Sequence, residues 1–143
     1  MREQEIADRL EIGDLLAKYA YAIDNGDWAR LDLVFTADAI IDYTSSGGVR
    51  GTREEARRWL AEALPRWPGR HHLIGAPIIR FEGDEAVVTA SFTGTLAPSR
   101  DTLPADTPGL VRGGGWHHHR MVRTPYGWRS RELVEEQAWR VVW

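Results

Sequence analysis

Two kinds of side chain that transfer protons stand out in the sequence: an aspartate at the end of a predicted helix and a histidine pair that opens a predicted strand. Asp24 lies in the last turn of a helix predicted over residues 3–25, where its charge faces the negative end of the helix dipole at a cost of about 0.3–1 kcal/mol. No capping role offsets this cost, because Asp27 holds the N-cap position of the next helix. A locally unfavourable residue of this kind indicates function. The alternative is a solvated aspartate at a helix end.

His71 and His72 open a strand predicted to run to Phe81, and strand alternation directs their side chains to opposite faces. One of the two can therefore point into a cavity while the other points outward. A neutral histidine held by a carboxylate is a common general base, because the carboxylate fixes the ring tautomer and stabilises the imidazolium. A surface histidine or a hydrogen-bonded core histidine is the alternative.

A second group of histidines follows Trp116 in the predicted strand over residues 110–124. Alternation places His117 and His119 on one face and His118 on the other, and two ligands fall short of the three or four that zinc takes. We therefore predict no metal site and expect His117 and His119 to give a cavity part of its polar lining. The alternative is a solvent-facing pair.

Tyr43 is the candidate from the first half of the chain. It ends a predicted strand, shares a face with Ala39 and Ile41, and could donate a hydrogen bond from its phenol to a substrate oxygen. Packing in the core is the alternative for this ring, and the two roles do not exclude each other.

The elements that must position these residues differ between the two halves of the chain. The first half predicts helices over 3–25 and 28–35, a strand over 39–43, and a helix that begins at a Thr52–Glu55 capping box and stops before Pro65. The second half predicts strands over 71–81, 86–97, 110–124 and 128–142, with hairpin turns at 82–85 and 125–127 and a proline-rich loop over 98–109. Helices followed by antiparallel strands indicate an α+β fold, with the helices on one face of a curved sheet and a cavity between them.

Composition limits the function further. The 143 residues suit one domain, and the 43% that are hydrophobic suffice for one core. A formal charge of −3 gives no basic footprint for nucleic acid, and the absence of cysteine excludes thiolate chemistry. Because the charged N-terminus resembles no signal peptide and no run approaches the ~20 apolar residues of a membrane helix, we expect a cytoplasmic protein without membrane contact.

The spacing of several of these residues resembles the SnoaL-like branch of the nuclear-transport-factor-2-like superfamily. The segments that carry the resemblance span nearly the whole chain: Tyr19-Ala-x-x-x-Asp24-x-Gly-Asp-Trp28-x-x-Leu31, Phe35-x-x-Asp38-x-x-Ile-Asp-Tyr43, His72-x-Ile-Gly75 and Gly-Trp128-Arg. The resemblance implies a cone-shaped α+β fold in which three N-terminal helices pack on a curved, mostly antiparallel sheet and enclose a pocket. It also implies a homodimer or homotrimer.

Within this superfamily the chain is most similar to the scytalone dehydratases, which have an Asp, a Tyr and a His at the positions of Asp24, Tyr43 and His72. The γ-hexachlorocyclohexane dehydrochlorinases pair an Asp and a His at two of these positions, and both families eliminate without a cofactor. Polyketide cyclases of secondary metabolism share the fold. The resemblance therefore implies Asp24 and His72 as a catalytic dyad, with no cofactor.

We therefore expect a cofactor-independent lyase, of dehydratase or cyclase type, that acts on a small, oxygenated and largely apolar substrate. His72 would take a carbon-bound proton, and Asp24 would orient His72. Tyr43, with His117 or His119, would hold a carbonyl or a leaving hydroxyl. Further substrate contacts are expected from Tyr19, Phe92, Leu96 and Trp116. Two alternatives remain: an isomerase that uses Asp24 itself as base, and a non-catalytic small-molecule-binding domain.

Overall fold

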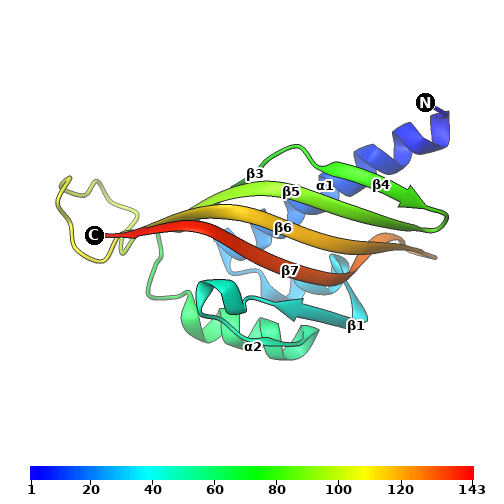
Figure 1. The fold of residues 1–143 in the computed structure, drawn as a ribbon. Helices are drawn as coiled ribbons and strands as arrows, with labels where there is room; N and C mark the ends of the chain where they lie inside the picture. The colour runs from blue at the N-terminus through cyan, green and yellow to red at the C-terminus, as the bar shows by residue number, and fades with distance from the viewer.

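A long N-terminal helix crosses one face of a curved sheet in the computed structural model, which describes residues 1–143 (Figure 1). Helix α1 runs from Glu3 to Asn25, as predicted, and ends at Gly26, whose left-handed backbone (φ 67°) suits glycine. Leu10 is exposed rather than on the core face with Ile12, because two residues along a helix turn the side chain by about 200°. Ile6 is exposed as well.

The segment after α1 differs from its prediction. It is a short 3-10 helix, η1 (Trp28–Leu33), and the chain then enters strand β1 (Phe35–Asp42), which is longer than predicted. Asp27 occupies the N-cap position of η1, but its carboxylate accepts from Arg30 at 2.7 Å and caps no backbone N–H. The predicted capping role of Asp27 is therefore wrong.

Two further helical segments follow β1: a short 3-10 turn and a helix that begins at a capping box. The turn is η2 (Thr44–Ser46), which follows Tyr43, and the helix is α2 (Arg53–Ala63). The predicted capping box at the start of α2 is confirmed, because the Thr52 side chain accepts from the backbone of Glu55 and the Glu55 side chain accepts from the backbone of Thr52.

Seven strands form one open sheet, in the order β2-β1-β7-β6-β5-β3, with β4 also paired to β5. Only β1 and β7 are parallel. The strands after β1 are β2 (Arg50–Thr52), β3 (His71–Ile74), β4 (Ile78–Glu82), β5 (Glu85–Leu96), β6 (Val111–Thr124) and β7 (Gly127–Val142). The single strand predicted over 71–81 is two strands, because the segment from Gly75 to Pro77 separates them and proline donates no backbone hydrogen bond.

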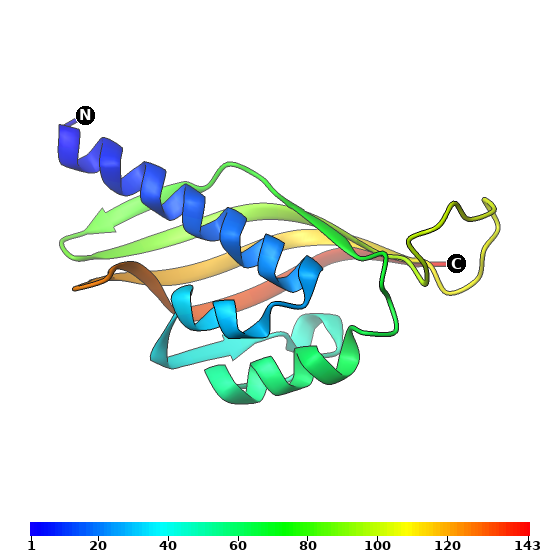
Figure 2. The same cartoon turned by 180° about the vertical axis from the view of Figure 1, so that it is seen from behind.

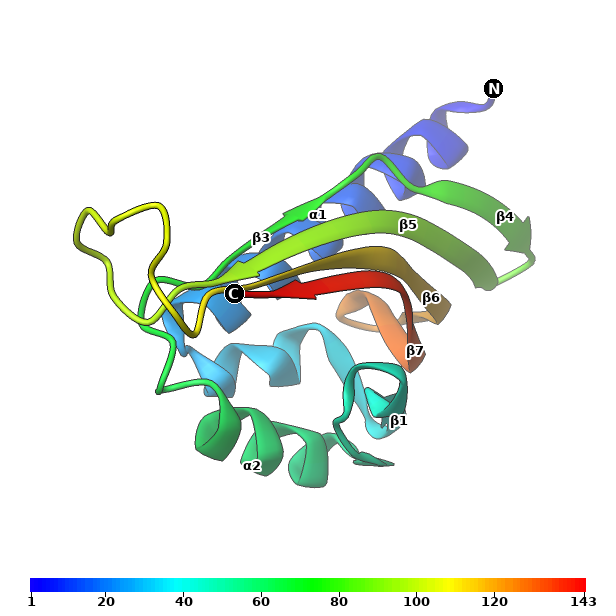
Figure 3. The ribbon, with the colours of Figure 1, turned by 60° about the vertical axis from the view of Figure 1, so that its left-hand side comes forward.

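The helices cover one face of the sheet and leave the other uncovered. Figure 2 shows α1 crossing β5, β6 and β7, with α2 beside β1, and Figure 3 shows these long strands curving over the helices. The core of 21 buried residues includes side chains from α1, α2, β1 and the strands β5 to β7. The loop over 97–110 projects beyond the ends of β5 and β6 (Figure 1). None of the helices has both the length and the apolar character of a membrane span.

A buried carboxylate ties α1 to the sheet far from the C-terminal end of that helix. Arg123 donates to both oxygens of Asp8, at 2.9 and 2.8 Å, and the indole N–H of Trp128 donates to the same carboxylate at 3.0 Å. The hydrogen bonds from Arg123 lower the pKa of Asp8 well below its usual range, against the opposing effect of burial. These bonds hold the N-terminal part of α1 against the sheet.

Candidate active site

Asp24 and His72 form a direct hydrogen-bonded pair although 48 residues separate them in sequence. Oδ1 of Asp24 lies 2.6 Å from Nδ1 of His72, and the backbone N–H of His72 donates to Oδ2 at 2.9 Å. One residue thus occupies both carboxylate oxygens, which fixes the imidazole relative to β3. With Nδ1 donating to the carboxylate, Nε2 is the ring atom that can accept a proton.

The imidazole of His72 enters a cavity of about 330 Å³, most of whose lining residues are hydrophobic. Asp24 does not line this cavity and lies behind the ring, so it lacks the isolated apolar site that an aspartate base would need. His71 alternates to the outside and is exposed. The strand start therefore delivers one histidine to the cavity and one to solvent, as alternation requires.

Gly94 gives the imidazole its space. It pairs with His72 across β3 and β5, and a Cβ atom at this glycine would lie 2.6 Å from Cδ2 and 2.9 Å from Nε2 of His72. Such distances are shorter than van der Waals contact, so a side chain here would displace the ring. Because Gly94 has no positive φ, its role is spatial rather than conformational.

Two phenols lie together in the wall of the cavity. The hydroxyl groups of Tyr19, on α1, and Tyr43, after β1, are 2.5 Å apart, and both side chains are buried. Burial raises the pKa of both phenols, so both keep their protons at neutral pH. Because one hydroxyl donates to the other, one O–H remains free to donate to a molecule in the cavity.

Glu135 adds an ionised carboxylate that the sequence analysis did not single out. Its Oε2 lies 3.3 Å from Nε2 of His117, and Ser46 donates to its Oε1 at 2.5 Å. Burial would raise the pKa of Glu135, but the hydrogen bonds from His117 and Ser46, with the charges of nearby histidines, outweigh burial and lower that pKa. Glu135 follows the apolar Leu133 by two residues in a predicted strand, and this spacing is the sequence signal that could have found it. In the structure Leu133 is buried, and Glu135 faces the same side.

The structure places most of the predicted lining residues at the cavity and removes two of them. Tyr19, Tyr43, His117, Phe92 and Leu96 all line it. The rings of Phe92 and His117 stack with their centres 4.1 Å apart, which holds the His117 imidazole flat against the β5 side of the wall.

His119 and Trp116 do not line the cavity, so both predictions are corrected. His119 is buried further along β6, stacked on Phe35, with Nδ1 2.8 Å from the hydroxyl of Ser130. Burial lowers the pKa of His119 to about 3, so the ring stays neutral. Trp116 precedes His117 and therefore alternates to the other face of the sheet, where it is 39% exposed. No group of three or more His, Asp or Glu side chains is placed to hold a metal ion.

Comparison with known proteins identifies the family. The family model of the SnoaL-like domain matches residues 4–134. The chain belongs to the SnoaL-like family. An uncharacterized protein of Mycobacterium tuberculosis is 37% identical to this SnoaL-like chain over 134 residues, which cover 94% of this chain and 88% of that protein.

Solved structures confirm the fold of this SnoaL-like chain. A candidate scytalone dehydratase from Novosphingobium aromaticivorans has a TM-score of 0.84 at 16% identity, over 100% of this chain and 92% of that one. A hexachlorocyclohexane dehydrochlorinase from Novosphingobium barchaimii has a TM-score of 0.80 at 16% identity, over 97% and 92%. A nuclear transport factor 2-like protein from Salmonella enterica has a TM-score of 0.74 at 18% identity, over 91% and 90%. The expected cone-shaped α+β fold of this superfamily is confirmed.

Proposed function

We propose that this SnoaL-like protein is a cofactor-independent lyase that removes a carbon-bound proton from a small, oxygenated and largely apolar substrate. The hydrogen bond of 2.6 Å between Asp24 and His72, with the imidazole entering a cavity in which 13 of the 24 lining residues are hydrophobic, carries the proposal. A histidine that a carboxylate orients is a recurrent general base, because the carboxylate stabilises the imidazolium as it forms.

In the proposed reaction, Nε2 of His72 accepts the proton, and the free O–H of the tyrosine pair donates a hydrogen bond to a substrate carbonyl. The electron pair left on carbon forms a double bond as a C–O bond breaks at the neighbouring carbon. The departing hydroxyl takes the proton back from His72, so that the net reaction releases one water. In a cyclisation, the same carbanion would instead attack a second carbonyl carbon of the substrate, and the alkoxide formed as that C=O π bond breaks would take the proton from His72.

The comparisons support this proposal at the level of the fold. Two of the similar structures are named for eliminations, a dehydration and a dehydrochlorination. Isomerisation is the second candidate function, because Glu135 gives the cavity an ionised carboxylate in addition to the imidazole of His72. Binding of a small molecule without turnover is the third candidate function.

The homodimer or homotrimer expected from the resemblance stays a prediction, and light scattering tests it.

Solvent exchange at carbon tests the proton abstraction that dehydration, cyclisation and isomerisation share. A panel of β-hydroxy ketones and β-hydroxy acids is incubated with the protein in D₂O, and deuterium at the α-carbon is followed by NMR. We expect the wild type to accelerate exchange for at least one member. His72→Ala should lower the exchange rate by about 10²–10⁴-fold, the usual contribution of a general base, and Asp24→Asn should lower it less.

The reverse order would replace the mechanism: an active His72→Ala together with an inactive Asp24→Asn would make Asp24 the base. Exchange that neither variant changes would remove the dyad from the chemistry. No exchange with any compound, together with binding that both variants weaken, would instead establish a binding domain. His71→Ala is the matched control, since His71 is the neighbouring histidine on the outside of β3 and should leave exchange unchanged.

A further inference from the structure

A cation lies across the cavity from the proposed base. The register of the sheet places four residues in one row: His72 on β3, Gly94 on β5, Gly113 on β6 and Arg140 on β7. All four line the cavity. Because the two middle residues are glycines, no side chain of this row separates the imidazole from the guanidinium.

The length of this row suits a small molecule. Neighbouring strands lie about 4.8 Å apart, so the three strand steps between His72 and Arg140 separate their backbones by about 14 Å. The His72 ring lies over Gly94, and Arg140 follows Gly113 at the opposite end of the row. A molecule that lies over Gly94 and Gly113 can therefore contact both ends at once.

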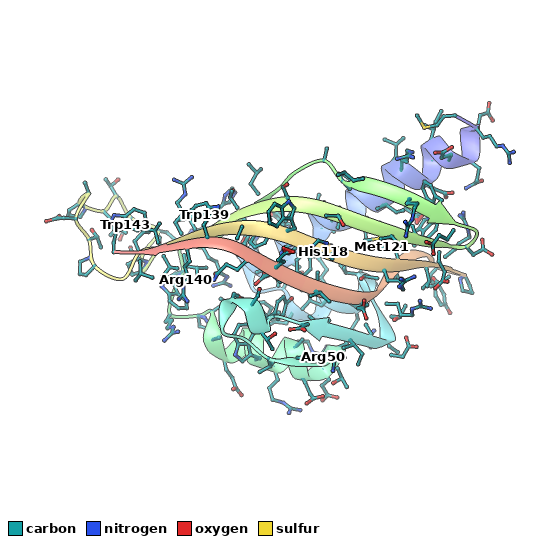
Figure 4. All side chains as sticks on the ribbon, viewed as in Figure 1. Arg50, His118, Met121, Trp139, Arg140 and Trp143 are labelled. Atoms are coloured by element: carbon teal, nitrogen blue, oxygen red, sulfur yellow. The ribbon has the colours of Figure 1, made fainter.

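Arg140 faces the cavity because of a β-bulge. Neighbouring residues of β6 pair with Gln137 and Trp139, so that Ala138 between these two has no partner. The extra residue shifts the alternation of β7. Gln137 lines the cavity, and beyond the bulge the lining residue is Arg140, whereas Trp139 is 43% exposed and does not line it. Figure 4 labels Trp139 and Arg140 near the C-terminal end of β7.

The guanidinium of Arg140 has no carboxylate partner within the chain, and neither has that of Arg66, a second exposed arginine of the cavity lining. The only carboxylate in the lining, that of Glu135, is engaged by His117 and Ser46. A guanidinium presents paired N–H donors that match both oxygens of a carboxylate. Arg140 therefore gives the cavity an unused anion-binding group.

We propose that Arg140 binds a carboxylate of the substrate and holds it across the glycine row from His72. Arg66, which lines the same cavity, supplies a second positive charge. The substrate is then a small, largely apolar acid whose reacting carbon lies over Gly94, next to the imidazole. A carboxylate suits the site better than a phosphate dianion, because the ionised Glu135 in the same cavity repels each added negative charge.

This inference rests on the proposed function for the role of His72, but binding alone tests it. Isothermal titration calorimetry with three probes is suitable: 2-naphthoate, its neutral isostere 2-naphthamide, and 2-naphthyl phosphate. We expect 2-naphthoate to bind at least about 10-fold more tightly than 2-naphthamide, the ratio that a charged hydrogen bond typically gives. Arg140→Gln should reduce this ratio to about two or less.

Arg112→Gln is the matched control. Arg112 is an exposed arginine on the neighbouring strand β6, it has no ion-pair partner, and it does not line the cavity. The control variant should keep the wild-type ratio, because its side chain contributes only to the general charge of the surface. His72→Ala should also keep the ratio while it loses deuterium exchange, so that failure of the base and failure of the carboxylate site give different results.

Three results would overturn the proposal. The first is equal affinity of the wild type for 2-naphthoate and 2-naphthamide, which includes no detectable binding of either. The second is a fall of the ratio in Arg112→Gln as large as that in Arg140→Gln. The third is tighter binding of 2-naphthyl phosphate than of 2-naphthoate, lost in Arg140→Gln, which would assign the site to a phosphate ester instead.

Discussion

Asp24 occupies a position that its own helix disfavours, since the last turn of α1 has no basic residue to offset the charge. The compensation comes from outside the helix, where the backbone and ring N–H groups of His72 both donate to the carboxylate. Two donors of one residue on one carboxylate restrict rotation of the imidazole. The orientation of the ring is therefore present before any substrate binds.

Replacement of Gly94 by alanine tests how closely the ring must be held. The new Cβ would lie 2.6 Å from Cδ2 of His72, so the ring must shift. We expect Gly94→Ala to lower the rate of deuterium exchange by about 10²-fold, the usual effect of a misplacement of about 1 Å. NMR of the imidazole signals in the same variant should report the displaced ring.

Gly75→Ala is the control for this substitution, because its Cβ would meet Ser91 at 3.4 Å, an ordinary contact. It should keep wild-type exchange and the wild-type melting temperature. A fully active Gly94→Ala with unshifted imidazole signals would show that the glycine is not needed at this position.

The contact of α1 with the end of the sheet predicts that the free energy of unfolding falls in acid. The pKa of Asp8 is lowered in the folded protein, so the stability from its bonds to Arg123 and Trp128 is present above the unfolded pKa of about 3.9 and is lost as pH falls toward the folded value. Asp8→Asn should lower the free energy of unfolding by about 1–3 kcal/mol at pH 7 and flatten its decline below pH about 4.

Urea denaturation at several pH values measures both effects, and Asp84→Asn is the control. Asp84 accepts from the same arginine at 3.0 Å, but its side chain is 84% exposed, so its removal should change stability little. If Asp8→Asn and Asp84→Asn lost the same free energy of unfolding, the buried position of Asp8 would contribute nothing to stability.

The elements were predictable where one local signal dominates. The bounds of α1, the capping box of α2 and the turn between β4 and β5 follow from glycine, threonine and glutamate at fixed offsets. The 3-10 form of η1 did not follow, because one short apolar pattern fits both kinds of helix. Arg140 was missed because its facing depends on the bulge at Ala138, which pairing with β6 sets.

The folded protein buries one histidine, His119, in its uncharged form. The pKa of His119 is lowered by burial to about 3, and that of an unfolded chain is about 6.5, so between these values only the unfolded state takes up the proton. Stability should therefore fall as pH drops below about 6.5, by up to about 1.4 kcal/mol per pH unit.

Replacement of His119 by glutamine removes this titration and keeps a side chain that can bond to Ser130. We expect the urea midpoint of His119→Gln to change less between pH 6.5 and pH 4 than that of the wild type. His118→Gln is the control, because His118 points to the opposite, exposed face of the sheet and pairs there with Glu136. An unchanged pH profile in His119→Gln would contradict the burial of a neutral ring.

The bulge at Ala138 sets the direction of Arg140, the proposed carboxylate-binding residue, but not that of His72, the proposed base. His72 and Asp24 are held by β3 and α1, and β3 lies three strand steps from β7, which carries Ala138 and Arg140. If Ala138 paired with Gly114 in a regular ladder, Trp139 would turn inward and Arg140 outward, while the proton-transfer groups stayed in place. A change in the pairing of β7 with β6 would thus alter the proposed carboxylate site and leave the Asp24–His72 pair untouched.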